Sequence, residues 1–94
     1  MSIKRWNAKS DSNQSQIVKT VNAHPYCTVL DLSGVGGGCT DLLVQYRDSK
    51  RSELFLIEVK TPGGKLNKKQ VKFHVEFDAY VARSADDVFR IVGA

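Results

Sequence analysis

Apolar and polar residues follow one another along this chain in patterns that predict a series of helices and strands. Ile17, Val18 and Val21 recur at helical spacing, and His24-Pro25 ends this helix because the residue before a proline avoids the helical region. Runs of β-branched, aliphatic and aromatic residues then predict strands, separated by turn clusters. The predicted elements are a helix at 11–23, strands at 26–32, 41–46 and 54–60, a helix at 67–76, a strand at 78–83, and a short helix at 85–89 capped by Ser84.

The segment after residue 66 fits two periodicities. Every second residue from 71 to 77 is apolar, which is typical of a strand. Leu66, Gln70 and Phe73 also lie on one face of a helix, and Asn67 is a good cap for its first turn. We therefore predict a helix here, with Gln70 on the inward face, where its amide needs hydrogen-bond partners.

The strand at 54–60 carries an acid and a base at one end. Its first four residues are apolar, which is typical of a buried strand, yet it ends in Glu58-Val59-Lys60. Side chains two positions apart point to the same face of a strand. Charged groups are seldom buried unless they are paired or bind an ion. Glu58 and Lys60 therefore mark the edge of a candidate site.

A hairpin between the two middle strands would bring a second acid to this site. If the chain turns at the polar residues between them, Asp41 lies opposite Glu58 and Leu43 lies opposite Leu56. Facing Cβ atoms in such a pair are about 4.5–5.5 Å apart, so the two carboxylates repel each other unless a cation lies between them. The Lys60 ammonium and a divalent metal ion are the two candidates for that cation.

Composition places the chain among ordinary globular proteins. With 94 residues, 41% of them hydrophobic and 26% charged, we expect a single domain over 1–94 with a loose basic arm at 1–10. No apolar run approaches the roughly 20 residues that span a membrane, so we expect no membrane partner. The two cysteines are too few for a disulfide scaffold, which favours reduced thiols and a cytoplasmic location.

The net charge of +4 is concentrated near the candidate site. Five lysines fall within 13 residues; they are Lys60, Lys65, Lys68, Lys69 and Lys72. An arbitrary lysine cluster is more often a solvated helix face than a binding surface. Because this cluster adjoins paired acids, we favour contact with phosphates.

A glycine-rich loop leads directly into Asp41. Four of the eight residues at 33–40 are glycine, and they include the run Gly36-Gly37-Gly38. A strand follows the loop, so it lacks the strand–loop–helix context of a nucleotide-binding glycine loop. A flexible connection is one interpretation. We favour the other, in which bare backbone passes close to a ligand.

These motifs together resemble a known family. The run 36–44, then Glu58-Val59-Lys60, then the stretch from Gly64 to Gln70, is similar to the virus-type replication-repair nuclease (VRR-Nuc) domain, a branch of the PD-(D/E)xK nuclease superfamily. The resemblance covers roughly residues 34–83. It implies an α/β fold of α-β-β-β-α-β order, with a mixed central sheet flanked by helices, and the activity of a metal-dependent DNA endonuclease.

The resemblance also implies roles for individual residues. Asp41, Glu58 and the backbone carbonyl of Val59 would bind Mg²⁺ or Mn²⁺, and the acids, Lys60 and Gln70 would be catalytic. The family usually has an acid on its first helix, where this chain offers Asp11 and, better aligned, Gln14 as a further metal-contacting candidate. The residues expected to contact nucleic acid are Lys65, Lys68, Lys69, Lys72, Gly36, Gly37 and Gly38. Backbone contacts carry no base information, so we expect recognition of DNA shape.

Three functions remain open at this point. The first is an endonuclease that is selective for branched, junction or flap DNA in replication and repair. The second is a catalytically weak or inactive nuclease-like module that binds DNA, which the missing first-helix acid favours. The third is an RNA- or protein-binding α/β domain that has no metal. A homodimer is expected only by analogy with small stand-alone members of the family.

Overall fold

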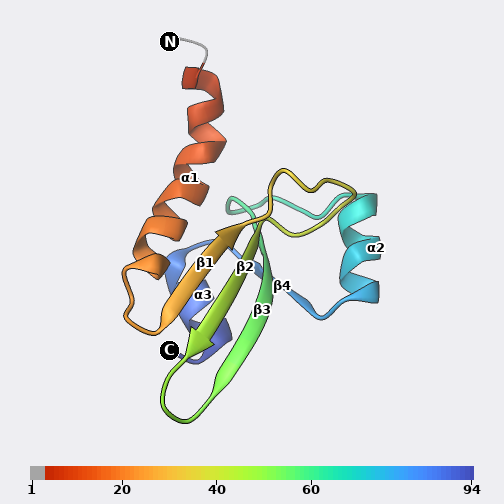
Figure 1. The fold of residues 1–94 in the computed structure, drawn as a ribbon. Helices are drawn as coiled ribbons and strands as arrows, with labels where there is room; N and C mark the ends of the chain where they lie inside the picture. Colours follow the sequence, from red (N-terminus) through yellow and green to blue (C-terminus); the bar gives the residue numbers. More distant parts are fainter. Residues whose placement is uncertain (1–3) are drawn as a thin grey trace.

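The computed structural model describes the backbone of residues 4–94 and the side chains from residue 13 onward (Figure 1). The elements are α1 (Lys4–Asn22), β1 (Cys27–Asp31), β2 (Leu42–Arg47), β3 (Ser52–Val59), α2 (Lys68–Glu76), β4 (Ala79–Ala82) and α3 (Ala85–Val92). This order confirms the predicted α-β-β-β-α-β arrangement, to which α3 adds a final helix. Within residues 4–94, no helix combines the length and the apolar character that a membrane span requires.

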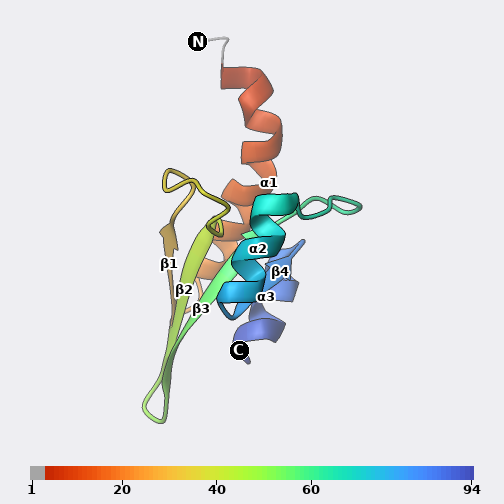
Figure 2. The ribbon, with the colours of Figure 1, turned by 90° about the vertical axis from the view of Figure 1, so that its right-hand side faces the viewer.

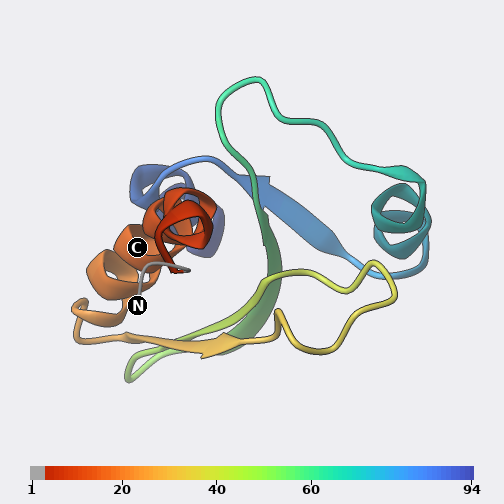
Figure 3. The same ribbon diagram turned by 90° about the horizontal axis from the view of Figure 1, so that it is seen from above.

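The four strands form one mixed sheet in the order β1-β2-β3-β4. β1, β2 and β3 are antiparallel neighbours, whereas β4 runs parallel to β3. A parallel pair needs a crossover connection, and here α2 provides it. Viewed from above, α1 and α3 lie on one side of the sheet and α2 lies on the other (Figure 3).

The register of the central hairpin agrees with the sequence prediction. Leu43 pairs with Leu56, and the next pair, Leu42 with Ile57, brings Asp41 and Glu58 to the following facing positions. The side chains of both strands therefore lie on the faces that the sequence predicts. A slip of the register by one residue would have exchanged the two faces.

The hydrophobic core lies between the sheet and the pair α1 and α3. Ile17 and Val21 of α1 pack against Leu42, Val44 and other fully buried residues of the strands and of α3. In contrast, none of the residues 68–76 in α2 is buried. In Figure 2, turned by 90° from Figure 1, α2 lies nearest the viewer, with α1 and α3 behind it. The structure is therefore held together mainly from one side of the sheet.

Three of the predicted boundaries or environments were wrong. α1 begins at Lys4 rather than residue 11, so residues 4–10 are helical and do not form a loose arm; residues 1–3 lie outside the described chain. α3 continues to Val92 instead of ending at residue 89. The strand β3 is buried only towards its end, and Leu54 is 64% exposed. The face of the sheet on which Leu54 lies has no core helix over it, so apolar sequence there did not mean burial.

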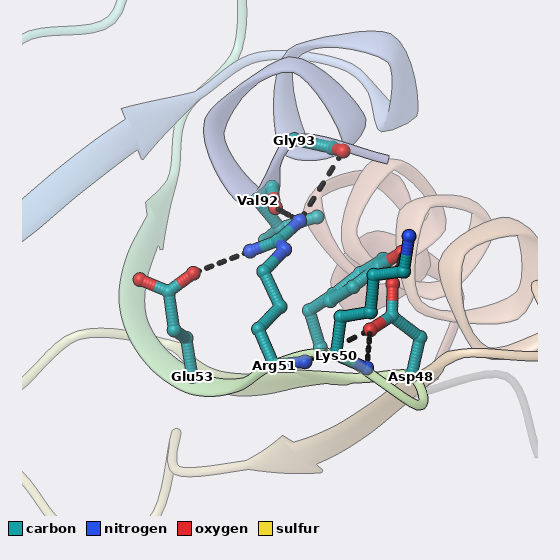
Figure 4. Close-up of polar contacts among 7 residues, drawn as sticks. Asp48, Lys50, Arg51, Glu53, Val92 and Gly93 are labelled. Atoms are coloured by element: carbon teal, nitrogen blue, oxygen red, sulfur yellow. Dashed lines mark hydrogen bonds and ion pairs between the residues drawn. The ribbon is translucent and has the colours of Figure 1, made fainter.

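Arg51 joins the end of the central hairpin to the end of the chain (Figure 4). Its Nη2 donates to the carbonyl oxygens of Val92, the last residue of α3, at 2.6 Å and of the capping Gly93 at 3.3 Å. Its guanidinium lies 3.8 Å from the centre of the Tyr46 ring and also pairs with Glu53. A cation at a helix C-terminus is favoured both by these hydrogen bonds and by the helix dipole.

We expect Arg51→Ala to lower the free energy of unfolding clearly more than Arg90→Ala does, because it removes a charged donor from two carbonyls and an aromatic contact. The matched control is Arg90→Ala, since the side chain of Arg90 is 73% exposed and its pair with Asp87 is worth at most about 1 kcal/mol. Urea denaturation of both variants measures the difference. Equal losses would show that Arg51 is not a specific link.

Candidate active site

Two acidic side chains meet at the end of the central hairpin. Asp41 immediately precedes β2, and its Oδ2 accepts a hydrogen bond from the backbone N–H of Val59 at 2.9 Å. Glu58, next to Val59 in β3, is 2% exposed. The contact with Val59 holds the Asp41 carboxylate at the end of β3, beside the buried Glu58.

Gln70 of α2 bridges Glu58 and Lys60. Its Nε2 donates to Glu58 Oε2 at 3.0 Å, and its Oε1 accepts from Lys60 Nζ at 2.9 Å. The Lys60 ammonium lies 3.9 Å from the same Glu58 oxygen. The second Glu58 oxygen, Oε1, is buried and has no hydrogen-bond partner among the described atoms. The acid, the base and the amide predicted from the sequence are therefore brought together.

The N-terminus of α2 fixes the orientation of the Gln70 amide. Gln70 Oε1 also accepts from the backbone N–H of Asn67 at 2.9 Å, while Asn67 Oδ1 accepts from the backbone N–H of Gln70 at 2.9 Å. This reciprocal pair is a capping box. Because two donors converge on Oε1, Nε2 has to face Glu58. Sequence analysis had identified Asn67 as a cap but missed its link to the site, which the Asn-x-x-Gln spacing signals.

The glycine-rich loop packs against the same end of α2. A Cβ atom on Gly38 would lie 2.4 Å from the backbone oxygen of Lys69, and the φ angle of Gly38 is +84°. Glycine is required here because the loop backbone touches the helix backbone. For Gly38, the close neighbour is therefore α2, whereas we had expected a ligand. Gly36 and Gly37 also have positive φ, and a Cβ atom on either would meet no described atom within 4 Å.

The environment of Glu58 disfavours its charge. Burial, together with the neighbouring Asp41 carboxylate, raises the pKa of Glu58 to about 7, and the Lys60 ammonium only partly opposes this. A buried carboxylate with one unpaired oxygen is expensive to ionise unless a cation approaches that oxygen. The site is therefore electrostatically suited to a positively charged ligand.

The donor set is compatible with a magnesium-type ion. Among the described residues, no three His, Cys, Asp or Glu side chains form a cluster, so the protein offers two carboxylates rather than a closed cage. Mg²⁺ prefers oxygen ligands and normally keeps several waters, so it is often bound by one or two carboxylates. The unpartnered Glu58 Oε1 beside Asp41 fits such an ion.

Gln14 is not brought to the two carboxylates. Its amide donates instead to Asp31 Oδ2 at 3.4 Å, and Asp31 also accepts from the backbone N–H of Ser33 at 2.8 Å. Asp31 ends β1 and pairs with Leu42, the residue after Asp41, but on this sheet it belongs to the face covered by α1. The side chain of Asp11 lies outside the described atoms. Sequence analysis missed Asp31, for which the chain carries no motif.

The remaining predicted contacts lie on the surface near α2. All four lysines are exposed; they are Lys65, Lys68, Lys69 and Lys72. Lys72 Nζ lies 3.6 Å from Glu76 Oε2, which offsets part of its charge. Lys68 and Lys69 open the helix that carries Gln70, so this basic surface adjoins the candidate site.

Comparison with known proteins now identifies the family. A sequence model of the VRR-NUC domain matches residues 1–85 of the 94-residue chain. The chain belongs to the VRR-NUC family. This match confirms the resemblance seen in the sequence, and it assigns the protein a nuclease-type function in DNA processing. No curated protein and no solved structure matches the chain.

The raised pKa of Glu58 predicts that the stability of this VRR-NUC domain depends on pH when divalent ions are removed with EDTA. The folded pKa of about 7 exceeds the ordinary 4.5, so the folded protein holds this proton more tightly than the unfolded chain. The resulting stabilisation is complete below pH 4.5 and is lost as pH rises towards 7. We expect a loss of about 2–3 kcal/mol.

Urea denaturation from pH 4.5 to 8 measures this loss, and Glu58→Gln should flatten the profile. The matched control is Asp78→Asn, which removes an exposed carboxylate. If Glu58→Gln and the parent protein lose the same stability over this range, the carboxyl group is not desolvated as described.

Proposed function

We propose that this VRR-NUC domain is a metal-dependent DNA endonuclease that hydrolyses phosphodiester bonds. The observation that carries the proposal is the buried Glu58 carboxylate, which lies next to Asp41 and Lys60 and has one oxygen without a partner among the described residues. A structural ion pair would normally satisfy both oxygens of a buried carboxylate. An oxygen left free beside a second acid favours a cation site.

In this proposal Asp41, Glu58 and the backbone carbonyl of Val59 hold Mg²⁺ or Mn²⁺. When bound, such an ion lowers the pKa of a water molecule and offsets charge on the phosphate. The Lys60 ammonium positions the attacking water and stabilises the negative charge that develops on the phosphate. Gln70 acts on Lys60 and Glu58 at once, since its amide touches both.

The substrate contacts proposed for the basic surface are to the DNA backbone. The phosphates would be contacted by Lys65, Lys68, Lys69 and Lys72. The loop at 36–38 would lie along the DNA strand. Such contacts position DNA without reading its bases. We therefore propose selectivity for DNA structure, with branched, junction or flap DNA as the substrates.

A second candidate is a nuclease-like module that binds DNA with weak or no turnover. Gln14, which stands in place of the usual first-helix acid, donates to Asp31 and not to the paired carboxylates. The metal would then have fewer protein ligands than in an enzyme with that acid. This candidate predicts salt-sensitive DNA binding that survives Glu58→Ala, without cleavage.

Cleavage assays distinguish the two candidates. Flap, four-way junction and linear duplex DNA of matched sequence are incubated with Mg²⁺, Mn²⁺ or EDTA. We expect cleavage only with a divalent ion, and a fall of about 100-fold or more in Asp41→Asn and Lys60→Ala, because each change removes a group that acts on the reacting atoms.

The controls for this assay are Asp78→Asn and Lys50→Ala, which make the same changes of charge at exposed positions away from the site. Cleavage that persists in EDTA or in the two site variants would reject the metal-dependent mechanism. Calorimetry with Mn²⁺ provides a second measurement, since binding should require Asp41 and Glu58.

We also propose that the protein forms a homodimer through the sheet face that no core helix covers. A row of paired residues crosses all four strands on this face; it consists of Leu30, Leu43, Leu56 and Ala79. Leu30 is 56% exposed, and Leu54 in the next row is 64% exposed. These rows contain no lysine. They therefore suit contact with the same surface of a second copy of the chain better than contact with a polyanion.

Light scattering should report a dimer for the parent chain and a monomer for Leu54→Asp, because a carboxylate in an apolar interface loses its hydration. Val35→Asp is the control, since Val35 is exposed to a similar degree, 66%, in the loop after β1. A parent chain that is monomeric at high concentration would rule out this interface.

A further inference from the structure

A small cleft lies between the glycine-rich loop and α2. It has a volume of about 310 Å³ and is lined by Gly37, Lys69, Lys72, Phe73 and Glu76. This volume is near the lower end of the range for small-molecule sites. The cleft is therefore large enough for one small ligand and too small for a nucleic-acid duplex.

The lining combines the groups that a nucleotide requires. The ring of Phe73 is half-buried and stacks on Phe77, with centroids 4.5 Å apart and an angle of 26° between the rings. An aromatic ring held in this way offers a firm apolar surface for a base, whatever its identity. Lys69 and Lys72 supply ammonium groups for a phosphate, and the Glu76 carboxylate can accept a hydrogen bond from an exocyclic amine.

The charge of the cleft matches one phosphodiester. Two ammonium groups and one carboxylate line it, and the Lys72–Glu76 pair at 3.6 Å leaves an excess of one positive charge, on Lys69. The bare backbone of Gly37 forms the opposite wall, where a Cβ atom would meet no described atom within 4 Å. A DNA strand can therefore pass close to the loop at Gly37.

The cleft adjoins the candidate active site through α2. Lys69 directly precedes Gln70, whose amide touches Glu58 and Lys60, and Phe73 lies one helical turn further on. The packing of Gly38 against the Lys69 backbone fixes the loop relative to this turn. A nucleotide held in the cleft would therefore place the neighbouring phosphates of its strand near the carboxylates.

We propose that this cleft binds one unpaired nucleotide, so that the protein recognises DNA in which a single strand leaves a duplex. The inference deepens the proposed nuclease function and rests on it. A base inside a duplex is stacked on both faces and cannot reach Phe73, whereas an unpaired base can. Binding of an unpaired base in this cleft would select a DNA structure and would not depend on the base sequence.

The test measures binding without turnover, in EDTA and with the whole chain. The probes are a single-stranded oligonucleotide containing 2-aminopurine and a blunt duplex of the same length. We expect quenching of 2-aminopurine on binding to the parent protein. Phe73→Leu, which keeps an apolar side chain but removes the ring, should weaken single-strand binding roughly 5- to 100-fold and leave duplex binding nearly unchanged.

Matched variants distinguish the effect of the cleft on DNA binding from the effects of net charge and of helix stability. Lys69→Ala should weaken single-strand binding more than duplex binding, while Lys68→Ala removes the same charge outside the cleft and should weaken both equally. Val75→Ala, at a position of α2 that is 80% exposed and outside the cleft, controls for changes in the helix. Circular dichroism confirms that each variant is folded.

The outcomes distinguish this inference from the proposed function. If Phe73→Leu and Lys69→Ala bind both probes as Val75→Ala and Lys68→Ala do, the nucleotide cleft is overturned, even where the protein cleaves DNA. If the selective loss is seen and cleavage assays are negative, the cleft is supported and the nuclease mechanism alone fails. An equal loss for both probes in Phe73→Leu also overturns the inference.

Discussion

The arrangement of this protein depends on a carboxylate that is almost removed from water. Glu58 is 2% exposed, and its charge is opposed by burial and by Asp41. Burying a charge is costly unless partners compensate. The Gln70 amide and the Lys60 ammonium compensate one oxygen, and no other group in the described part of the chain pairs with the second. An incompletely paired buried acid makes this end of the sheet electrostatically suited to a cation.

The hydrophobic core and the candidate active site lie on opposite faces of the sheet. The face covered by α1 and α3 contains the hydrophobic core, and Arg51 ties the hairpin to α3 on that side. The other face bears the paired acids, the apolar row through Leu43, and α2, which buries none of its residues. Elements with few buried contacts open more easily than a core does. The groups that we propose to meet the substrate thus lie on the less constrained part of the fold.

Polar and steric contacts hold α2 in position, since none of its residues is buried in a hydrophobic interface. The Asn67 capping box orients Gln70, and the absence of a side chain at Gly38 lets the loop backbone touch Lys69. Both contacts act on the first turn of the helix. The same turn presents Gln70 to the acids on one side and Lys69 to the small cleft on the other.

The sequence by itself determined the order of the elements, the pairing of Leu43 with Leu56 and hence the approach of Asp41 to Glu58, because strand alternation and capping are local rules. Local rules could not show that residues 4–10 are helical or that Leu54 is exposed. Only the tertiary structure decided that Gln70 spans Glu58 and Lys60 and that Gln14 turns to Asp31. Those contacts depend on how separate elements dock, and no periodicity within one element records the docking.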